Sequence, residues 1–399
     1  MLLQIEEPNP DTPPGLPLLR TGLRPFYLLS ALAAAITVPV WLAVLLIPLP
    51  WPAPMAPVYW HAHEMIYGFA GATVIGFLLS ASRAWTGLGT TRAGALGGLA
   101  LLWLAGRVAL FVAPYPLYAA LDLALLPIVA AVLIRLLLST GMRRNLPLAI
   151  IMLALALANL VFHLAVLQWL EVLPPPSALH AALGLLVLMQ SVMAGRVIPG
   201  FTISAARGAL RIAPLPWLDK ACLGATAAGL ASWVAAPPAW SAWTAAVLLL
   251  AALGHALRQW RWRSRVVWQR PVLWILHAAY LWITLGLALL ALAHLGWIAL
   301  SAGIHALGVG ATGGLIIGMM TRTARGHTGR SLHTGGWEIG AYALVLLAAA
   351  LRVAQTLAPA QATTPLLVSA ATAWSTAFAI YLWIYTPWLV HTRTDGRDG

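Results

Sequence analysis

The sequence predicts an all-α, polytopic integral membrane protein: a bundle of about twelve transmembrane helices with both termini in the cytoplasm. Hydrophobic residues make up 61% of the 399 residues and charged residues only 8%, and the mean hydropathy is +0.86. Apolar runs of about 20 residues, the length that crosses a bilayer as a helix, recur along the whole chain. The alternating segments of about ten residues that are typical of a transmembrane β-barrel do not occur.

Each apolar run predicts one span, and polar or proline-rich connections such as Pro237-Pro238 separate them. The predicted spans are 23–48, 60–82, 93–113, 117–138, 146–169, 178–198, 217–235, 240–258, 271–293, 299–320, 337–357 and 365–389. No connection is long enough for a soluble domain. We therefore expect one membrane domain over 22–390, with polar cytoplasmic tails at 1–21 and 391–399. The first tail lacks the basic start and apolar run of a signal peptide.

The positions of Lys and Arg support this count of spans. Of the 23 Lys and Arg residues, 21 fall on one alternating side of the predicted spans. They are Arg20, Arg24, Arg83, Arg92, Arg135, Arg143, Arg144, Arg196, Arg207, Arg211, Lys220, the cluster from Arg258 to Arg270, Arg322, Arg325, Arg330, Arg393 and Arg397. By the positive-inside rule, this side is cytoplasmic and the number of spans is even. The net charge of +13 thus reflects membrane topology, and no motif indicates nucleic-acid binding.

Two arginines, Arg107 and Arg352, depart from this alternation because each lies in the outer half of a span. An unpaired charge there is expensive. Asp122 begins the next span at the depth of Arg107, so an ion pair between adjacent helices would account for Arg107. Arg352 would reach the outer surface by extending along its helix. The functional alternative is that both arginines hold an anionic group such as a haem propionate.

The single cysteine, Cys222, limits the chemistry. It excludes an intramolecular disulfide, a Cys-x-x-Cys-His haem attachment site and an iron–sulfur cluster.

Histidines are the main candidates for function, and the predicted topology sorts them by depth. Those at the outer level are His61, His63, His163, His180, His294 and His305, and those at the inner level are His255, His277, His327, His333 and His391. A bundle core is where side chains from facing helices build metal or cofactor sites, and neutral imidazole suits iron, copper and zinc. One such histidine alone is more often a hydrogen-bonded core residue, but the outer group is larger than the acids available to pair with it.

The segment Trp60-His61-Ala62-His63-Glu64-Met65 opens the second span with two histidines and a carboxylate. Residues two apart on a regular helix point about 200° away from each other. His61 and His63 would then serve different neighbours, whereas an irregular start would let both bind one metal. Glu64 is a candidate to orient a ligand or to relay protons.

The tenth span opens at His305 and carries five glycines, Gly308, Gly310, Gly313, Gly314 and Gly318. Small residues allow close helix packing; the alternative is that they leave room for a flat macrocycle. His277 is placed where a polar neighbour would satisfy it. His327 lies in a predicted Gly-rich inner loop, where solvation would satisfy it.

Several short motifs occur together from the first span to the tenth. They are Arg24-Pro25-Phe26, Trp60-His61-Ala62-His63-Glu64-Met65-x-x-Gly68-Phe69, Trp85-Thr86-Gly87, Asn159-Leu160-x-x-His163, Gly195-Arg196-Val197-Ile198-Pro199-x-Phe201-Thr202, Leu276-His277-x-x-Tyr280-Leu281-Trp282, His305-Ala306-Leu307, Met320-Thr321-Arg322 and Gly326-His327-Thr328-Gly329-Arg330. As a set they resemble the NnrS family, over nearly the whole chain. The segment Ser82-Arg83-Ala84 departs from the family pattern, which has an Asn beside the Trp.

The resemblance implies a bacterial inner-membrane protein with twelve spans that contains haem b and copper and is linked to nitric oxide tolerance and denitrification. The histidines that match the family pattern are His61, His63, His163, His277, His305 and His327, and His180 joins them by depth alone. We expect metal ligands among His61, His63, His163, His180 and His305, and cofactor contacts from Arg107, Arg352, His277 and His327.

The expected activity is reduction of two NO molecules to N2O, by analogy with other haem–copper reductases. Glu64 would deliver protons, and the electrons would come from an unidentified donor, a quinol or a cytochrome. One alternative is a transporter of copper, haem or another solute, since twelve spans is a common transporter count; no internal repeat supports it. The other is a haem-based NO sensor without turnover.

Overall fold

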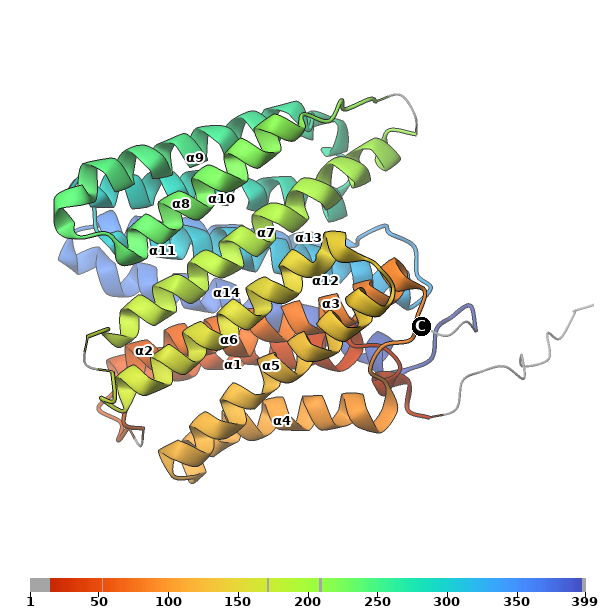
Figure 1. Cartoon of the computed structure of the whole chain (residues 1–399), viewed down its shortest axis with the longest axis horizontal. Helices are drawn as coiled ribbons and strands as arrows, with labels where there is room; N and C mark the ends of the chain where they lie inside the picture. Colours follow the sequence, from red (N-terminus) through yellow and green to blue (C-terminus); the bar gives the residue numbers. More distant parts are fainter. Residues whose placement is uncertain (1–14, 52, 171, 208–209, 397–399) are drawn as a thin grey trace, which may run out of the picture.

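The computed structural model describes residues 15–51, 53–170, 172–207 and 210–396. Within these ranges the chain forms long helices and no strands (Figure 1), which confirms the predicted all-α membrane fold. Most of the predicted N-terminal tail, residues 1–14, and the end of the C-terminal tail, 397–399, lie outside the described residues.

The helices follow the predicted spans closely. They are α1 (Leu23–Leu46), α2 (Pro57–His63), α3 (Gly71–Thr86), α4 (Ala93–Val112), α5 (Tyr115–Ser139), α6 (Leu146–Val166), α7 (Pro175–Ala205), α8 (Pro216–Ala235), α9 (Ser241–Arg261), α10 (Pro271–His294), α11 (Leu300–His305), α12 (Gly314–His327), α13 (Gly336–Leu357) and α14 (Ala360–Val390). Proline occupies the first turn of six of them, where its missing N–H costs no intrahelical bond.

Two spans are each built from two α-helices joined by a π-helical segment. The segment Glu64–Ala70 joins α2 to α3, and Ala306–Gly313 joins α11 to α12. Counted this way, twelve helical units cross the bundle in the described part of the chain. Eleven of these units are long and apolar enough to span a membrane. The twelfth, α8, is 20 residues long and carries two charged residues, Asp219 and Lys220, near its start.

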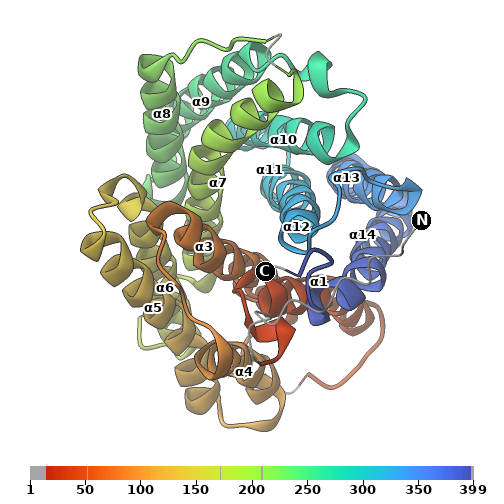
Figure 2. The ribbon, with the colours of Figure 1, turned by 90° about the vertical axis from the view of Figure 1, so that its right-hand side faces the viewer.

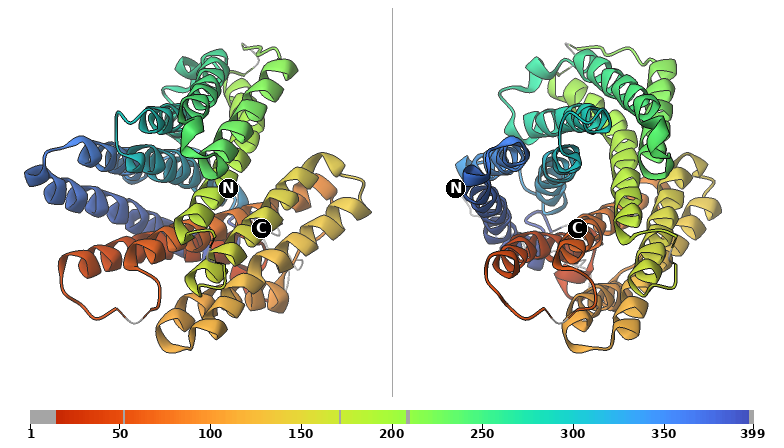
Figure 3. Two further views of the ribbon diagram at one scale, coloured as in Figure 1. Left: turned by 60° about the vertical axis from the view of Figure 1, so that its left-hand side comes forward. Right: turned by 90° about the vertical axis from the view of Figure 1, so that its left-hand side faces the viewer.

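Both ends of the described chain lie at one end of the bundle. Arg24 at the start of α1 donates from Nη1 to the carbonyl oxygens of Leu389 (2.9 Å) and His391 (2.7 Å). We call this the inner end, after the predicted topology. Figure 2 looks onto it and shows α12 surrounded by other helices, and Figure 3 shows the same arrangement from the outer end. The hairpins α4–α5 and α8–α9 lie at the periphery.

The prediction of an inner loop around His327 is wrong. Helix α12 continues through Thr321 and Arg322 to end at His327, which is partly buried. Apolar residues stop near Met320, so hydropathy alone marks the end of the span too early. The helix extends because Arg325 is held by Glu338 on α13, and Thr321 and Thr328 bond back to carbonyls within the helix.

The glycines of the tenth span mostly serve close packing, as small residues at helix interfaces do. A Cβ at Gly310 would overlap Trp282, one at Gly313 would overlap Trp374, and one at Gly318 would lie 2.8 Å from Leu276. Gly308 is different, because no heavy atom lies within 4 Å of where its Cβ would be. Among the five glycines of the predicted span, Gly308 alone has open space at its Cβ position.

A polar network near the inner end connects the four helices α7, α8, α9 and α10. Arg258 on α9 donates to Asp219 (2.8 Å) and to the Tyr280 hydroxyl (3.0 Å), and Tyr280 contacts His255 Nδ1 at 2.5 Å. Arg258 is 3% exposed, so these partners are what allows a cation at this depth. Gly195 on α7 makes room for it, since a Cβ there would overlap the guanidinium.

Replacing Gly195 with alanine is therefore expected to displace Arg258 and to lower the free energy of unfolding by about 1–3 kcal/mol, the usual cost of overpacking. Thermal unfolding in detergent measures this. Gly200, on the same helix with open space at its Cβ, is the matched control: G200A should be neutral or stabilising by up to about 1 kcal/mol. Equal melting temperatures for G195A and G200A would contradict the packing argument.

Candidate metal centre

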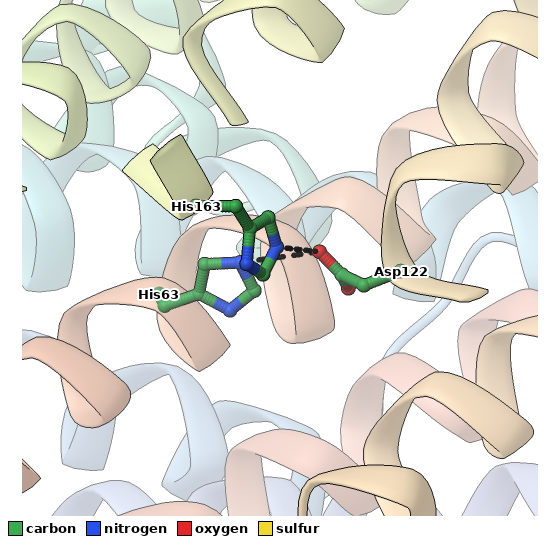
Figure 4. A group of neighbouring side chains, drawn as sticks. All are labelled: His63, Asp122 and His163. Atoms are coloured by element: carbon green, nitrogen blue, oxygen red, sulfur yellow. Dashed lines mark hydrogen bonds and ion pairs between the residues drawn. The ribbon is translucent and has the colours of Figure 1, made fainter. Parts of the chain in front are cut away.

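Three side chains from three spans converge at the outer half of the bundle: His63 at the end of α2, Asp122 on α5 and His163 on α6 (Figure 4). The Nε2 atoms of His63 and His163 lie 3.2 Å and 3.1 Å from the same oxygen, Asp122 Oδ2. All three residues are buried. Donor atoms around one metal ion with bonds of about 2.0–2.1 Å would be about 3.3 Å apart in a tetrahedral site. The two nitrogen–oxygen separations match this value, and all three donor atoms lie within 4.8 Å of one another.

The other nitrogen of each imidazole has its own partner. His63 Nδ1 lies 3.4 Å from Glu64 Oε1, and His163 Nδ1 lies 2.9 Å from the Tyr115 hydroxyl. Metal-binding histidines usually donate their second ring N–H to a carboxylate or another acceptor, which fixes the ring and its tautomer. Glu64 and Tyr115 stand in these positions.

Binding one metal ion through both Nε2 atoms requires the imidazole protons to be on the two Nδ1 atoms. On His63 this proton faces the Glu64 carboxylate, and on His163 it faces the Tyr115 hydroxyl. Two nitrogen lone pairs and a carboxylate oxygen then point at one another, and a bound cation stabilises them. Without a metal, a proton on each Nε2 is donated to Asp122 Oδ2 or, from His63, to Asn159 Oδ1.

Charge also favours a bound cation or proton. Arg107 Nη1 lies 3.2 Å from Glu64 Oε2, and its Nη2 forms an ion pair with Asp122 Oδ1, the predicted pairing with the adjacent helix. With neutral imidazoles, Glu64 and Asp122 carry two negative charges against one on Arg107. A buried group with one uncompensated negative charge is costly. A bound cation, or a bound proton, would balance it.

Two further residues fix Asp122 and leave room beside it. Asn159, one turn before His163 on α6, donates from Nδ2 to Asp122 Oδ2 (2.6 Å) and lies 2.9 Å from His63 Nε2 through Oδ1. Gly68 has no side chain where a Cβ would lie 2.7 Å from Glu64 Oε2. Its absence allows the Glu64 carboxylate to fold back along the π-helical segment.

A cavity of about 10 Å³, enough for one water-sized molecule, adjoins this cluster between α3, α4 and α5. Asp122, Asn159 and Arg107 line one part of it, and Leu102 and Leu121, both partly exposed on the lipid-facing hairpin, line another. The cavity thus has both a charged and an apolar wall.

We group His61 and His305 as a second pair, because both interact electrostatically with Arg352 and neither belongs to the His63–Asp122–His163 cluster. His61 stacks on Trp41 of α1 at 4.3 Å, and it interacts electrostatically with His305 and with Arg352 of α13. His305 Nδ1 donates to the Ser301 carbonyl oxygen at 2.7 Å, which leaves its Nε2 as a lone pair. His61 Nδ1 is buried and has no hydrogen-bond partner in the described part of the chain.

The surroundings of this pair fit an anionic cofactor. Arg352 bonds to Gln355 and has no carboxylate within 4.0 Å among the described residues. Gly308, one turn beyond His305, adjoins the open space described above. One histidine of each pair, His63 and His305, directly precedes a π-helical segment, and the two segments contact each other. π-Helical turns within α-helices are frequent at functional sites.

The remaining predicted ligands lie apart from both pairs. His180 stacks on Trp233 of α8 at 4.8 Å. His277 has both nitrogens satisfied, by Thr202 (3.0 Å) and Ser264 (2.9 Å), as expected for a hydrogen-bonded core histidine. His327 ends α12 at the opposite end of the bundle. Four of the six outer histidines, on α2, α6 and α11, thus fall into two pairs.

Sequence reasoning missed Asp122 as a ligand, because the ion pair with Arg107 accounted for its charge. A carboxylate has two oxygens, and here Oδ1 serves Arg107 while Oδ2 faces the imidazoles. Tyr115 was missed because nothing in the sequence marks it. The spacing Asn159-x-x-x-His163, which places both side chains on one helix face, was the available signal.

Fold and cluster together define a multi-pass helical membrane protein with a buried histidine–carboxylate centre. A family profile described as NnrS protein matches residues 17–393, and the chain belongs to the NnrS family. It is a membrane protein of the nitric oxide response. No curated protein matches the chain.

Proposed function

We propose that this protein binds copper and haem b in a bacterial inner membrane and reduces nitric oxide there. The observation that carries the proposal is the convergence of His63 Nε2, His163 Nε2 and Asp122 Oδ2 within a buried cluster. With neutral imidazoles, this cluster has one negative charge more than positive charges. Two NO molecules, two electrons and two protons give N2O and water. A quinol or a cytochrome would supply the electrons.

Copper would be held by His63, His163 and Asp122. Imidazole and carboxylate donors without a thiolate also suit zinc or non-haem iron, so the assignment to copper rests on the family. Glu64 and Tyr115 would keep the imidazoles in the ligating tautomer, and Arg107 would aim Asp122. Copper and haem iron, when bound, supply the one-electron redox chemistry.

Haem would be held by His61 or His305, with Arg352 paired to a propionate. The unpartnered nitrogen of His61, the free lone pair of His305 Nε2 and the open space at Gly308 support this placement. Arg352 would gain the carboxylate that it otherwise lacks.

Glu64 would handle protons. It is 4% exposed and contacts both His63 and Arg107, so its carboxylate would hold a proton beside the metal centre and pass it to a reactant there. Nitric oxide is small, neutral and soluble in lipid, and would approach through the cavity between α4 and α5.

The test is to purify the protein in detergent, measure iron and copper per chain and record the haem absorption spectrum. We expect both metals in stoichiometric amounts and consumption of NO, with release of N2O, when a reductant is added. Metals with NO binding but no N2O would leave the sensor alternative, and absence of both metals from freshly purified protein would contradict the proposal.

A further inference from the structure

One tyrosine beside the cluster is neither a proposed metal ligand nor a hydrogen-bond partner of one. Tyr118 lies on α5, one turn before Asp122, and is 0% exposed. Its hydroxyl has no hydrogen-bond partner in the part of the chain that the structure describes. Buried hydroxyl groups are nearly always hydrogen-bonded, because they lose their water on burial.

Tyr118 lies against the two imidazoles. Its ring centroid is 5.3 Å from that of His163 and 6.4 Å from that of His63, and both contacts are edge-on. The hydroxyl also interacts electrostatically with Arg107 and Glu64, although neither is within hydrogen-bond distance. The ring of Tyr118 therefore packs against both imidazoles of the metal centre.

Two other phenols touch the same histidines, and both are satisfied. Tyr67, whose ring lies 4.7 Å from that of His63, donates to the Leu155 carbonyl oxygen at 3.3 Å. Tyr115 bonds to His163 Nδ1. Among these three neighbours of the cluster, the hydroxyl of Tyr118 alone is left to bond to something that the protein does not supply.

We propose that Tyr118 donates its O–H to a small ligand bound at the His63–Asp122–His163 centre, namely an oxygen or nitrogen atom of a nitrogen oxide. The inference rests on the proposed function, since it requires a metal at this centre. It adds a group that contacts the ligand directly and stabilises negative charge on it. Phenol is suited to this role, being a neutral donor that does not repel a metal.

Azide binding to the copper-loaded protein tests this, because azide is a small anion that binds copper and accepts hydrogen bonds. Tyr118→Phe removes only the hydroxyl. We expect azide to bind about fivefold to tenfold more weakly to Y118F, the effect of one neutral hydrogen bond, with copper content unchanged. The azide stretching band of the wild type should shift in D2O, and that shift should be smaller in Y118F.

Tyr67→Phe is the matched control, since it removes a hydroxyl of a second phenol that packs on His63 but bonds elsewhere. Y67F should bind azide like the wild type. Equal azide affinity and equal D2O shift in Y118F and the wild type would overturn the inference and leave the copper site intact, as expected if a structural water satisfies the hydroxyl. A wild-type protein that takes up no copper at this centre would instead overturn the proposed function, and the inference with it.

Discussion

Replacing Asp122 with alanine is expected to abolish copper binding and to lower the free energy of unfolding by about 3–5 kcal/mol, because several buried polar groups lose their partner at a cost of about 1–3 kcal/mol each. The carboxylate is the common partner of Arg107, Asn159 and both imidazoles. Without it the ligand set falls to two nitrogens, and Arg107 keeps its contact with the Glu64 carboxylate. Copper per chain and thermal unfolding in detergent measure the two effects.

Asp122→Asn separates these effects. The amide keeps the shape of the side chain and can still accept a hydrogen bond, but it is a much poorer metal ligand and has no charge for Arg107. We expect D122N to lose copper nearly as fully as D122A while destabilising the fold less. Full copper retention in both variants would show that Asp122 is a structural partner of Arg107 and not a ligand.

Alanine substitutions of the outer histidines are expected to divide into two classes. His63→Ala and His163→Ala should lose copper and keep haem, because they remove nitrogens from the first pair. His61→Ala and His305→Ala should lower haem content and keep copper. Each loss should be large, since removing one of two or three protein ligands leaves a metal poorly held. Metal analysis and the haem spectrum of each variant measure the outcome.

The metal that each variant retains serves as its folding control. His180→Ala and His277→Ala are matched controls of the same chemistry, and both should keep copper and haem, because one histidine stacks on Trp233 and the other is satisfied by Thr202 and Ser264. If His63→Ala and His61→Ala lose both metals together in equal proportion, the two pairs act as one site and the separation is wrong.

The spans could be predicted well because two independent signals agree on them. Apolar runs gave the lengths, and the alternation of Lys and Arg fixed their number; α8, predicted as 217–235, is helical over Pro216–Ala235. The ends were harder where polar residues continue a helix. Helix α7 runs past Pro199 to Ala205, and α12 runs past Met320 to His327, beyond the apolar stretches.

The depth of each histidine along its helix could also be predicted from the sequence. The side of the helix on which its side chain lies could not. His61 and His63 were expected either to serve two neighbours or to share one metal, and the structure turns His61 toward Trp41 and His63 toward Asp122. The π-helical segments that follow His63 and His305 rotate the rest of each span relative to its start. The pattern of hydrophobic residues in the sequence does not reveal such a rotation.

The pairing of histidines across helices depends on which helices are neighbours, and that information is absent from a single sequence of similar apolar runs. His180 shares the depth of the other outer histidines and lies on α7, yet it faces α8. Arg352 was placed at the outer level correctly, but its proximity to both His61 and His305 follows only from the packing of α13 beside α11.

X-ray absorption at the copper edge of the purified protein tests the central assignment most directly. We expect scattering from two imidazoles and one further oxygen at about 2 Å, and from one imidazole in His163→Ala if any copper remains. A spectrum without imidazole scattering, or one that is the same in His163→Ala as in the wild type, would contradict a centre built from His63, Asp122 and His163.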